Sequence, residues 1–232
     1  MKKYLMATNM LDFECNELQQ LIESRKWKDN DEFHKILNIY NFVRDEIKFG
    51  YNVDDSIPAS KVLDDGYGQC NTKGTLFMAL LRSVGIPCRI HGFTIDKKLQ
   101  KGAMTGLIYK LAPNNIVHSW VEIYFEGKWL NIEGFILDMV YLNKLQLKFS
   151  ECYEYFCGYG VATNDFKKPQ IEWNMNDTYI QKEGINQDFG IFHSPDEFLE
   201  QHSQELSTLK KWFYQNIGRK LMNRNVSKIR EG

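Results

Sequence analysis

The chain has 232 residues, of which 43% are hydrophobic and 14% aromatic, and its net charge is −1. This length and composition can build one sizeable core, so we expect a single domain over residues 1–232. A nearly neutral chain has no overall electrostatic field that attracts nucleic acid or an anionic membrane, and we predict neither as a partner. The locally basic stretch from Lys210 to Arg230 is interpreted as a solvated helical face with a frayed tail.

The five cysteines are an odd number in a long chain, which argues against a disulfide framework. The first residues carry two lysines but no adequate apolar stretch before Asp12, so we predict no signal peptide. No apolar run approaches the roughly 20 residues that span a bilayer. These features predict a reduced, cytoplasmic protein, provided that the printed sequence includes the native start.

The first part of the chain, residues 1–50, is predicted to be helical. Asp12 to Lys26 forms one expected helix, and Asp31 to Lys48 forms a second, whose apolar residues recur with a 3.6-residue period. Asn30 is the expected cap of the second helix, with Asp29 as the alternative.

A third helix is predicted from Cys70 to Ser83, because Gly85 and Pro87 follow it as stop signals. The pattern then changes to that of β-strands. Cys88 to Ile95 is one expected strand, and His118 to Phe125 is another. A short turn at Glu126-Gly127 leads to a returning strand, Lys128 to Ile132, which completes a hairpin.

Residues 139–232 are predicted to be an aromatic-rich elaboration followed by a C-terminal helix. The aromatic part, residues 139–190, lacks a clean period and is expected to pack on the core as mixed structure. Ser194 followed by Pro195 is a good helix start. That helix is expected to reach about Gln215, with Gly218 interrupting or ending it.

One thiol, Cys70, lies where a loop containing Gly66 and Gly68 runs into the third helix. A free thiol has a pKa near 8.5, and the positive end of a helix or a neighbouring imidazolium can activate it. His118 is the candidate base, and Glu133 is the candidate carboxylate that orients it. Taken singly, the three residues are more typical of a core cysteine, a satisfied strand histidine and a solvated carboxylate.

Several segments occur together in a characteristic order. They are Gly68-Gln69-Cys70, Ala79 to Arg89, His118 to Tyr124, Gly127-Lys128-Trp129 and Glu133. Together they resemble the transglutaminase-like superfamily of cysteine enzymes, over about residues 57–138. The resemblance implies an α+β, papain/transglutaminase-like core, in which a nucleophile-bearing helix packs on an antiparallel sheet, here with N- and C-terminal helical additions. It also implies a catalytic triad of Cys70 as thiol nucleophile, His118 as base and acid, and Glu133 as orienter.

The third member of this set departs from the family pattern. The family usually has an aspartate four residues after the tryptophan, and this chain has Glu133 four residues after Trp129. Asp138 is a nearby alternative. We favour Glu133 because of its distance from Trp129, while a degenerate enzyme stays an open alternative.

The site wall and the oxyanion donors are less well specified by the sequence. The Cys70 N–H is the natural first donor. Gln69, Tyr51, Tyr67 and Trp120 are candidates for a second donor or for the wall, although Gln69 also suits a loop-stabilising role and the aromatic residues also suit the core. Lys97 to Asn115 is predicted as a loop or short helix over the site.

No metal or organic cofactor is predicted. A zinc site built from Cys88, His91, Cys152 and Cys157 has spacings that fit no common pair of zinc knuckles. No phosphate-binding loop or dinucleotide fingerprint is present, and no loop suggests the calcium dependence of some relatives.

We therefore expect a stand-alone, bacterial-type cysteine enzyme that attacks an amide and forms a thioester. Its substrate would be a peptide, a protein or a small amide. Hydrolysis, as in a cysteine protease or amidase, is favoured because water is always present. A transglutaminase or acyltransferase with an amine acceptor, and a catalytically silent binding module, are the alternatives. The sequence predicts neither the substrate nor the oligomeric state.

Overall fold

The computed structural model describes all residues from Met1 to Gly232. Helices make up most of its regular structure, and none of them is both long enough and apolar enough to cross a membrane. The α-helices are α1 (Asn16–Ser24), α2 (Glu32–Asn41), α3 (Ala59–Asp65), α4 (Cys70–Ser83), α5 (Gly106–Leu111), α6 (Met139–Lys148), α7 (Pro195–Gln201), α8 (Thr208–Phe213) and α9 (Arg219–Glu231). Shorter 3₁₀ or π segments are η1 (Lys2–Leu5), η2 (Trp27–Asp29), η3 (Phe42–Glu46), η4 (Lys97–Gln100), η5 (Lys182–Gly184) and η6 (Tyr214–Gly218).

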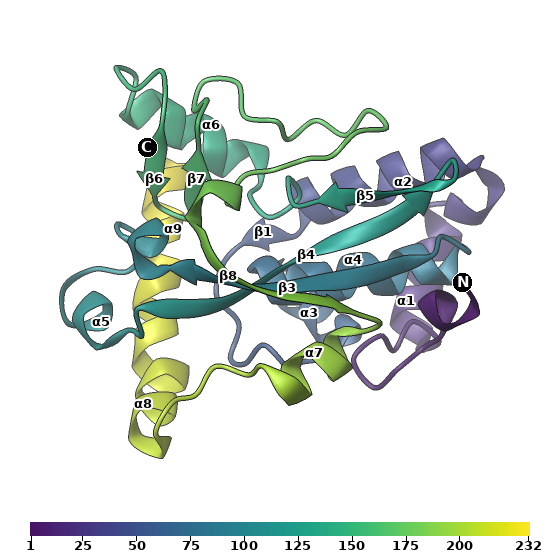
Figure 1. Cartoon of the computed structure of the whole chain (residues 1–232), viewed down its shortest axis with the longest axis horizontal. Helices are drawn as coiled ribbons and strands as arrows, with labels where there is room; N and C mark the ends of the chain where they lie inside the picture. The colour runs from purple at the N-terminus through teal and green to yellow at the C-terminus, as the bar shows by residue number, and fades with distance from the viewer.

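A four-stranded antiparallel sheet with the order β5-β4-β3-β8 crosses the molecule (Figure 1). The strands of the structure are β1 (Lys48–Phe49), β2 (Tyr67–Gly68), β3 (Cys88–Asp96), β4 (Asn115–Phe125), β5 (Lys128–Ile132), β6 (Phe156–Gly158), β7 (Val161–Thr163) and β8 (Ile185–Phe192). β4 and β5 form the predicted hairpin. Its turn residues, Glu126 and Gly127, both have positive φ angles, as the tightest hairpin turns require.

Helix α4 lies along one face of this sheet, on the same side as α1, α2 and α3 (Figure 1). Of its 14 residues, 13 are buried, from Cys70 to Arg82. Gly74 faces β4: a Cβ atom there would lie 3.6 Å from Val121 Cγ2. The predicted arrangement, an α+β fold with the Cys70 helix packed on an antiparallel sheet, is confirmed.

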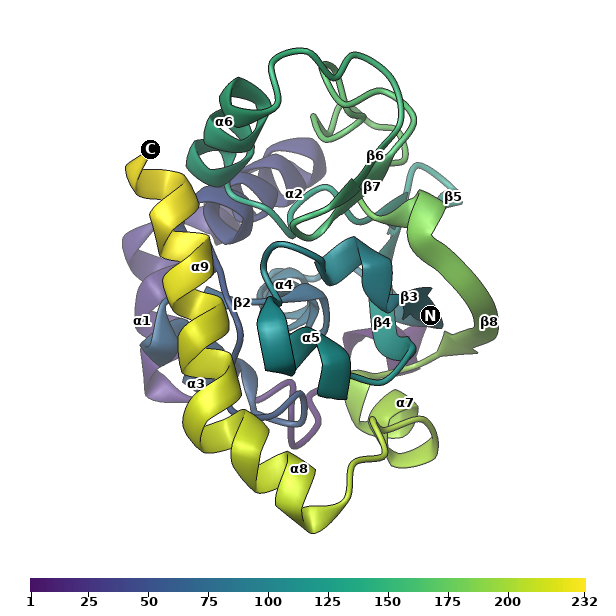
Figure 2. The same cartoon turned by 90° about the vertical axis from the view of Figure 1, so that its left-hand side faces the viewer.

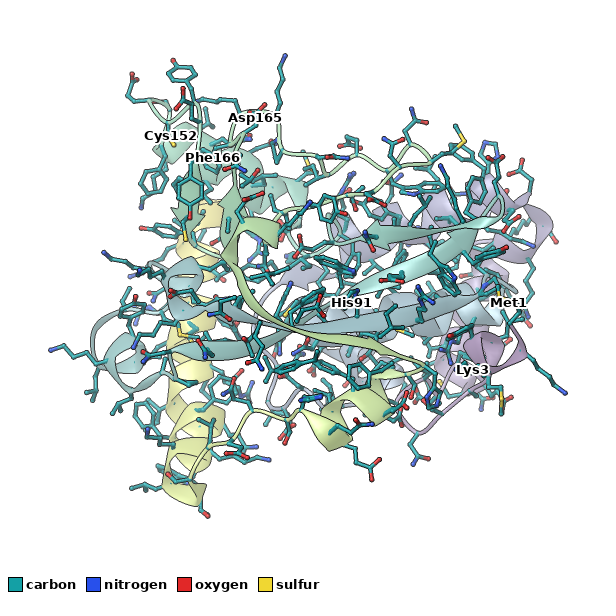
Figure 3. The ribbon with its side chains drawn as sticks, viewed as in Figure 1. Met1, Lys3, His91, Cys152, Asp165 and Phe166 are labelled. Atoms are coloured by element: carbon teal, nitrogen blue, oxygen red, sulfur yellow. The ribbon has the colours of Figure 1, made fainter.

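The fourth strand, β8, lies outside the segment that the sequence indicated as the core. It pairs with β3, the strand that carries His91 (Figure 3), and His91 lies opposite Ile191 in the register. The His91 ring joins the strands, with Nδ1 2.8 Å from Glu122 Oε1 and Nε2 2.9 Å from Asp188 Oδ1. Partial burial lowers the pKa of His91, but the two carboxylates outweigh burial and raise it. β8 escaped prediction because it is an edge strand with mostly exposed or half-exposed side chains, which weakens the apolar alternation.

The two N-terminal helices begin later than predicted. The cap of α2 is Asp31, whose carboxylate accepts a hydrogen bond from the His34 N–H at 2.9 Å, so the choice of Asn30 or Asp29 was wrong. α1 begins at Asn16 because Asp12 binds elsewhere: its carboxylate accepts hydrogen bonds from the Ser60 N–H and hydroxyl. Local capping patterns could not distinguish these neighbouring polar residues.

The predicted C-terminal helix is divided into two parts. Ser194 caps α7, as expected, by accepting a hydrogen bond from the Glu197 N–H at 3.3 Å. α7 ends at Gln201 rather than near Gln215, and a non-helical segment precedes α8. Gly218 does not end the helical segment, because α8, η6 and α9 follow one another without a break and form one continuous rod (Figure 2).

The end of the chain is not a frayed tail. Met222, Val226 and Ile229 on α9 are buried in the core. The Arg230 guanidinium pairs with the Asp138 carboxylate, which also caps α6 by accepting from the Tyr141 N–H. The basic residues of this stretch therefore flank an apolar stripe that joins α9 to the body.

Candidate active site

Cys70 is the first residue of α4 and is 7% exposed. Its N–H lies in the first helical turn, where a backbone N–H has no acceptor within the helix. Gly66 adopts a left-handed conformation, with φ of 67°, and ends α3. Gly68 is required for a different reason: a Cβ atom there would lie 2.6 Å from Thr72 Oγ1 and 2.9 Å from Lys73 Cγ. The loop thus closes tightly onto α4 itself and sets the position of the thiol.

Polar side chains hold this loop against the start of α4. The Gln69 N–H donates to Thr72 Oγ1 at 3.1 Å, and the Thr72 hydroxyl donates to Asn52 Oδ1 at 2.6 Å. The Asn52 N–H in turn donates to Gln69 Oε1 at 3.1 Å. Each of these three residues is buried, so the bonds are shielded from competing water.

His118 lies on β4 and has no exposed surface. Its Nε2 is 2.8 Å from Glu133 Oε1. Its Nδ1 has no hydrogen-bond partner, and the Cys70 thiol lies beside the ring and interacts with it. The nitrogen that remains available to the thiol is therefore Nδ1, and the structure brings the three predicted residues together in the order thiol, imidazole, carboxylate.

Glu133 is held by a segment that the sequence did not implicate. Its Oε2 accepts hydrogen bonds from the backbone N–H groups of Ile180 at 2.8 Å and Gln181 at 2.9 Å. Its own N–H donates to the Thr178 carbonyl at 3.0 Å. Because these partners are backbone groups in the aromatic-rich elaboration, no residue type in the sequence could have revealed them.

The charges around His118 favour its protonated form. Complete burial by itself lowers the pKa of His118, but Cys70 and Glu133 act in the opposite direction and raise it to about 10. An imidazolium that is close to a thiol favours the thiolate. The arrangement therefore places a protonated imidazole beside the thiol at neutral pH.

A cavity of about 880 Å³ reaches Cys70 from the molecular surface. Of its 33 lining residues, 19 are hydrophobic, and they include much of α5 and α8. His118 and Glu133 do not line this cavity, so a ligand in it would meet the thiol first. The segment predicted to lie over the site, Lys97 to Asn115, contributes part of the cavity wall through α5.

The four candidates for the second oxyanion donor or for the site wall have different environments. Tyr51 and Gln69 line the cavity, whereas Tyr67 and Trp120 do not. The Tyr51 hydroxyl donates to Gln100 Oε1, and Gln69 Nε2 donates to Asp55 Oδ1, both at 2.5 Å. Both groups thus already have partners, which suits a stabilising role in the loop and wall.

Tyr67 and Trp120 lie away from the cavity for different reasons. The Tyr67 hydroxyl accepts a hydrogen bond from Arg219 Nη1 at 3.5 Å, which directs it toward the C-terminal rod. The Trp120 ring packs on Phe93, with ring centroids 4.2 Å apart, and its buried indole N–H has no partner. Neither residue lines the space that a ligand next to the thiol would occupy.

Asp138, the alternative third member, is engaged elsewhere. Its carboxylate pairs with Arg230 and accepts hydrogen bonds from the N–H groups of Phe49 and Tyr141, both at 2.9 Å. These contacts connect β1, α6 and α9. They leave Glu133 as the carboxylate that contacts His118.

Sequence reasoning missed a second polar network beside the thiol. Asp55 accepts hydrogen bonds from Gln69 Nε2 at 2.5 Å and from Asn71 Nδ2 at 3.1 Å. Asn71 Oδ1 accepts from the Ser119 hydroxyl at 2.8 Å. This network joins the loop before α3, the start of α4 and the strand that carries His118. The only sequence signal for it is that Asn71 and Ser119 directly follow the two candidate catalytic residues.

Two of the residues considered for a zinc site, Cys88 and His91, take part in other contacts. The Cys88 thiol is buried and donates to the Met78 carbonyl at 3.6 Å, and burial raises its pKa to about 11. His91 already bridges two carboxylates. No three His, Cys, Asp or Glu side chains are grouped so as to hold a metal ion.

Comparison with known proteins relates this geometry to a family. Residues 19–134, half of the chain, match the model of the transglutaminase-like superfamily. The uncharacterized protein YebA of Bacillus subtilis (strain 168) is 32% identical over 98 residues, which cover 41% of this chain but only 13% of that protein. A crystal structure named as a "putative cysteine protease", from Cytophaga hutchinsonii, is 14% identical with a TM-score of 0.48, and the match covers 84% of this chain and 47% of that one. The chain therefore spans about one eighth of the length of YebA and about half of the length of the Cytophaga hutchinsonii protein.

Proposed function

We propose, because the chain belongs to the transglutaminase-like superfamily of cysteine-dependent enzymes, that it catalyses acyl transfer from an amide through a thioester on Cys70. The observation that carries this proposal is the position of His118, which lies beside the Cys70 thiol and 2.8 Å from Glu133 Oε1. A peptide, a protein or a small amide is the proposed substrate class.

The reaction follows from the roles of these groups. The Cys70 thiolate attacks the carbonyl carbon, and the N–H of Cys70, in the first turn of α4, donates to the developing oxyanion. The C–N bond then breaks, and the His118 imidazolium gives its proton to the leaving amine. Glu133 keeps the proton on Nε2 while His118 is neutral and stabilises the imidazolium when it forms.

We favour hydrolysis as the second half-reaction. Neutral His118 can take a proton from water, which attacks the thioester, releases the acid and restores the thiol. An amine acceptor would make the enzyme a transferase by the same first step. The chemistry requires no metal or organic cofactor, and a reduced compartment such as the cytoplasm suits a thiol nucleophile.

Alkylation of the thiols by iodoacetamide tests the activated nucleophile. A free thiol with a pKa of about 8.5 loses roughly two orders of magnitude in rate between pH 9 and pH 6. We expect Cys70 to lose less than tenfold, when adducts are quantified by peptide mass spectrometry. Cys15, whose pKa is raised first of all by burial, is an internal control that should lose its reactivity at pH 6.

Two variants complete this test. His118→Ala should return the pH profile of Cys70 to that of a free thiol, and Cys70→Ala should abolish turnover of an amide library. If the alkylation rate of Cys70 falls with pH as steeply as that of Cys15, the result would instead favour a catalytically silent binding module. Partition of a trapped thioester between water and added methylamine then separates a hydrolase from a transferase.

A further inference from the structure

The cavity at Cys70 is bounded by two elements that lie outside the core helix and sheet. In Figure 2, α4 is seen end-on, with α5 in front of it and the rod of α8 and α9 at the side. Both α5 and α8 line the cavity, together with the segment that joins α7 to α8. At about 880 Å³, the cavity lies near the upper end of the range for small-molecule sites.

The wall of the cavity as a whole is mainly hydrophobic, at 19 of its 33 residues. Aliphatic side chains such as Leu107, Ile108, Leu111 and Leu209 line it, together with the aromatic rings of Trp212 and Phe213. Several residues at the rim are unusually exposed for their type: Leu107 at 61%, Leu111 at 40% and Leu209 at 77%. Apolar side chains that gather around a cavity in this way mark a surface that a ligand covers.

Of the four charged groups that line the cavity, three already have partners, and the fourth, Lys210, is exposed at the surface. Lys211 Nζ lies 2.9 Å from Asp54 Oδ2, so these two charges compensate each other. Asp55 is satisfied by Gln69 and Asn71. A neutral apolar group therefore suits the wall better than a charged one.

The edge of β4 beside the cavity is already occupied. The Val117 N–H donates to Gln204 Oε1 at 3.0 Å, and Gln204 Nε2 donates to the Asn115 carbonyl at 3.5 Å. The side-chain amide of Gln204 thus takes the main-chain partners that an added peptide strand would use. This occupation favours a ligand without a peptide backbone.

We propose that the cavity binds the unbranched aliphatic acyl chain of the substrate, so that the enzyme cleaves N-acyl amides of medium to long chain length. This inference rests on the proposed function, because it places the acyl carbonyl at Cys70. The thiolate forms a C–S bond to the carbonyl carbon while the C–N bond breaks, and the amine leaves with the proton from His118. Water then cleaves the thioester, so that amide plus water yields fatty acid plus amine.

Binding to the full-length Cys70→Ala variant tests the cavity without any chemistry. Acetamide, hexanamide and decanamide serve as the probes, and calorimetry measures their affinity. Because burial of each methylene contributes about 0.8 kcal/mol, we expect Kd to fall by about threefold to fourfold per added carbon. Equal or undetectable binding of all three amides would overturn the inference and leave the proposed chemistry of Cys70 untouched.

Acylation of the wild-type enzyme tests the same chain preference at the thiol. The probes are p-nitrophenyl esters with acyl chains of 2 to 10 carbons and an apolar tetrapeptide anilide. We expect the rate of Cys70 acylation, followed by mass spectrometry, to rise with chain length. Faster acylation by the peptide, or equal rates for all esters, would overturn the inference. Amide binding without an adduct from any probe would instead reject the proposed function.

Two surface variants form a matched pair for this experiment. Leu111→Asp places a charge on the wall, and Leu147→Asp places one on α6, where Leu147 is 71% exposed and does not line the cavity. Leu111→Asp should lower the ratio of decanoyl to acetyl acylation by at least tenfold. Leu147→Asp should leave that ratio unchanged. An unchanged ratio in both variants would contradict the assignment of the cavity.

Discussion

His118 Nε2 and Glu133 Oε1 lie 2.8 Å apart, and neither side chain has any exposed surface. The second carboxylate oxygen of Glu133 accepts two further N–H groups, from Ile180 and Gln181. One carboxylate thus serves three donors that have no access to water. An amide side chain has only one acceptor oxygen and cannot do the same.

Glu133→Gln should therefore impair both the chemistry and the fold. Loss of the charge removes the stabilisation of the imidazolium, and the glutamine NH₂ group must face at least one N–H donor. We expect Cys70 alkylation at pH 6 to slow by about a hundredfold, and we expect the melting temperature to fall. Glu133→Gln with the wild-type rate would show that this carboxylate does not orient His118.

Asp138→Asn should separate stability from activity. The substitution weakens the ion pair with Arg230 and should destabilise the protein by about 1–3 kcal/mol. Because Asp138 does not contact His118, Cys70 alkylation per folded molecule should stay near the wild-type value. Urea unfolding together with alkylation kinetics checks both parts. A large loss of reactivity in the folded variant would restore Asp138 as the third member.

The pKa of His118 should depend on Cys70. Burial lowers this pKa, and Cys70 and Glu133 raise it to about 10, so Cys70→Ala should lower it. Because the folded pKa lies above the unfolded value of about 6.5, the stabilisation is fully present below pH 6.5 and is lost as the pH rises through about 10. NMR titration of the His118 ring measures the shift directly. The same titration midpoint in both proteins would mean that the thiol does not interact with the ring.

Lys73 should impose the opposite pH dependence on stability. It is fully buried on α4, and burial lowers its pKa to about 7, while Nζ donates to the carbonyls of Arg44 at 3.1 Å and Ile136 at 3.0 Å. A depressed pKa contributes stability that is present above the unfolded value of about 10.4 and is lost as the pH falls through about 7. Lys73→Met removes this dependence. The stability of the wild type relative to this variant should therefore rise between pH 7 and pH 10, as measured by urea unfolding.

Replacement of Gly68 and of Gly74 by alanine should change the stability of the protein in opposite directions. At Gly68 a methyl group would lie 2.6 Å from Thr72 Oγ1, so Gly68→Ala should displace the start of α4 and lower both stability and Cys70 reactivity. At Gly74 the nearest atom is 3.6 Å away, within ordinary contact, so Gly74→Ala should stabilise the helix by about 0.5–1 kcal/mol. Thermal unfolding of the two variants provides the measurement. Equal destabilisation by both would argue against the tight loop at Gly68.

The sequence alone predicted the elements that carry the three central side chains. The bounds of α4 and β5 agree with the prediction because α4 combines a glycine-containing start with a buried apolar run, and β5 follows a two-residue turn. Local patterns of this kind depend on neighbours within a few residues. The ordered segments from Gly68 to Glu133 also indicated the family to which the chain belongs.

Only the tertiary structure decided which carboxylate contacts His118, how it is held and what reaches the thiol. Glu133 depends on backbone N–H groups almost 50 residues away, and backbone groups leave no trace in side-chain patterns. Asp138 is drawn to Arg230, 92 residues further along the chain. The cavity is lined by α5, by α8 and by Cys70 at the start of α4. Contacts between such distant segments arise from packing of the whole chain, and local periodicity contains no information about them.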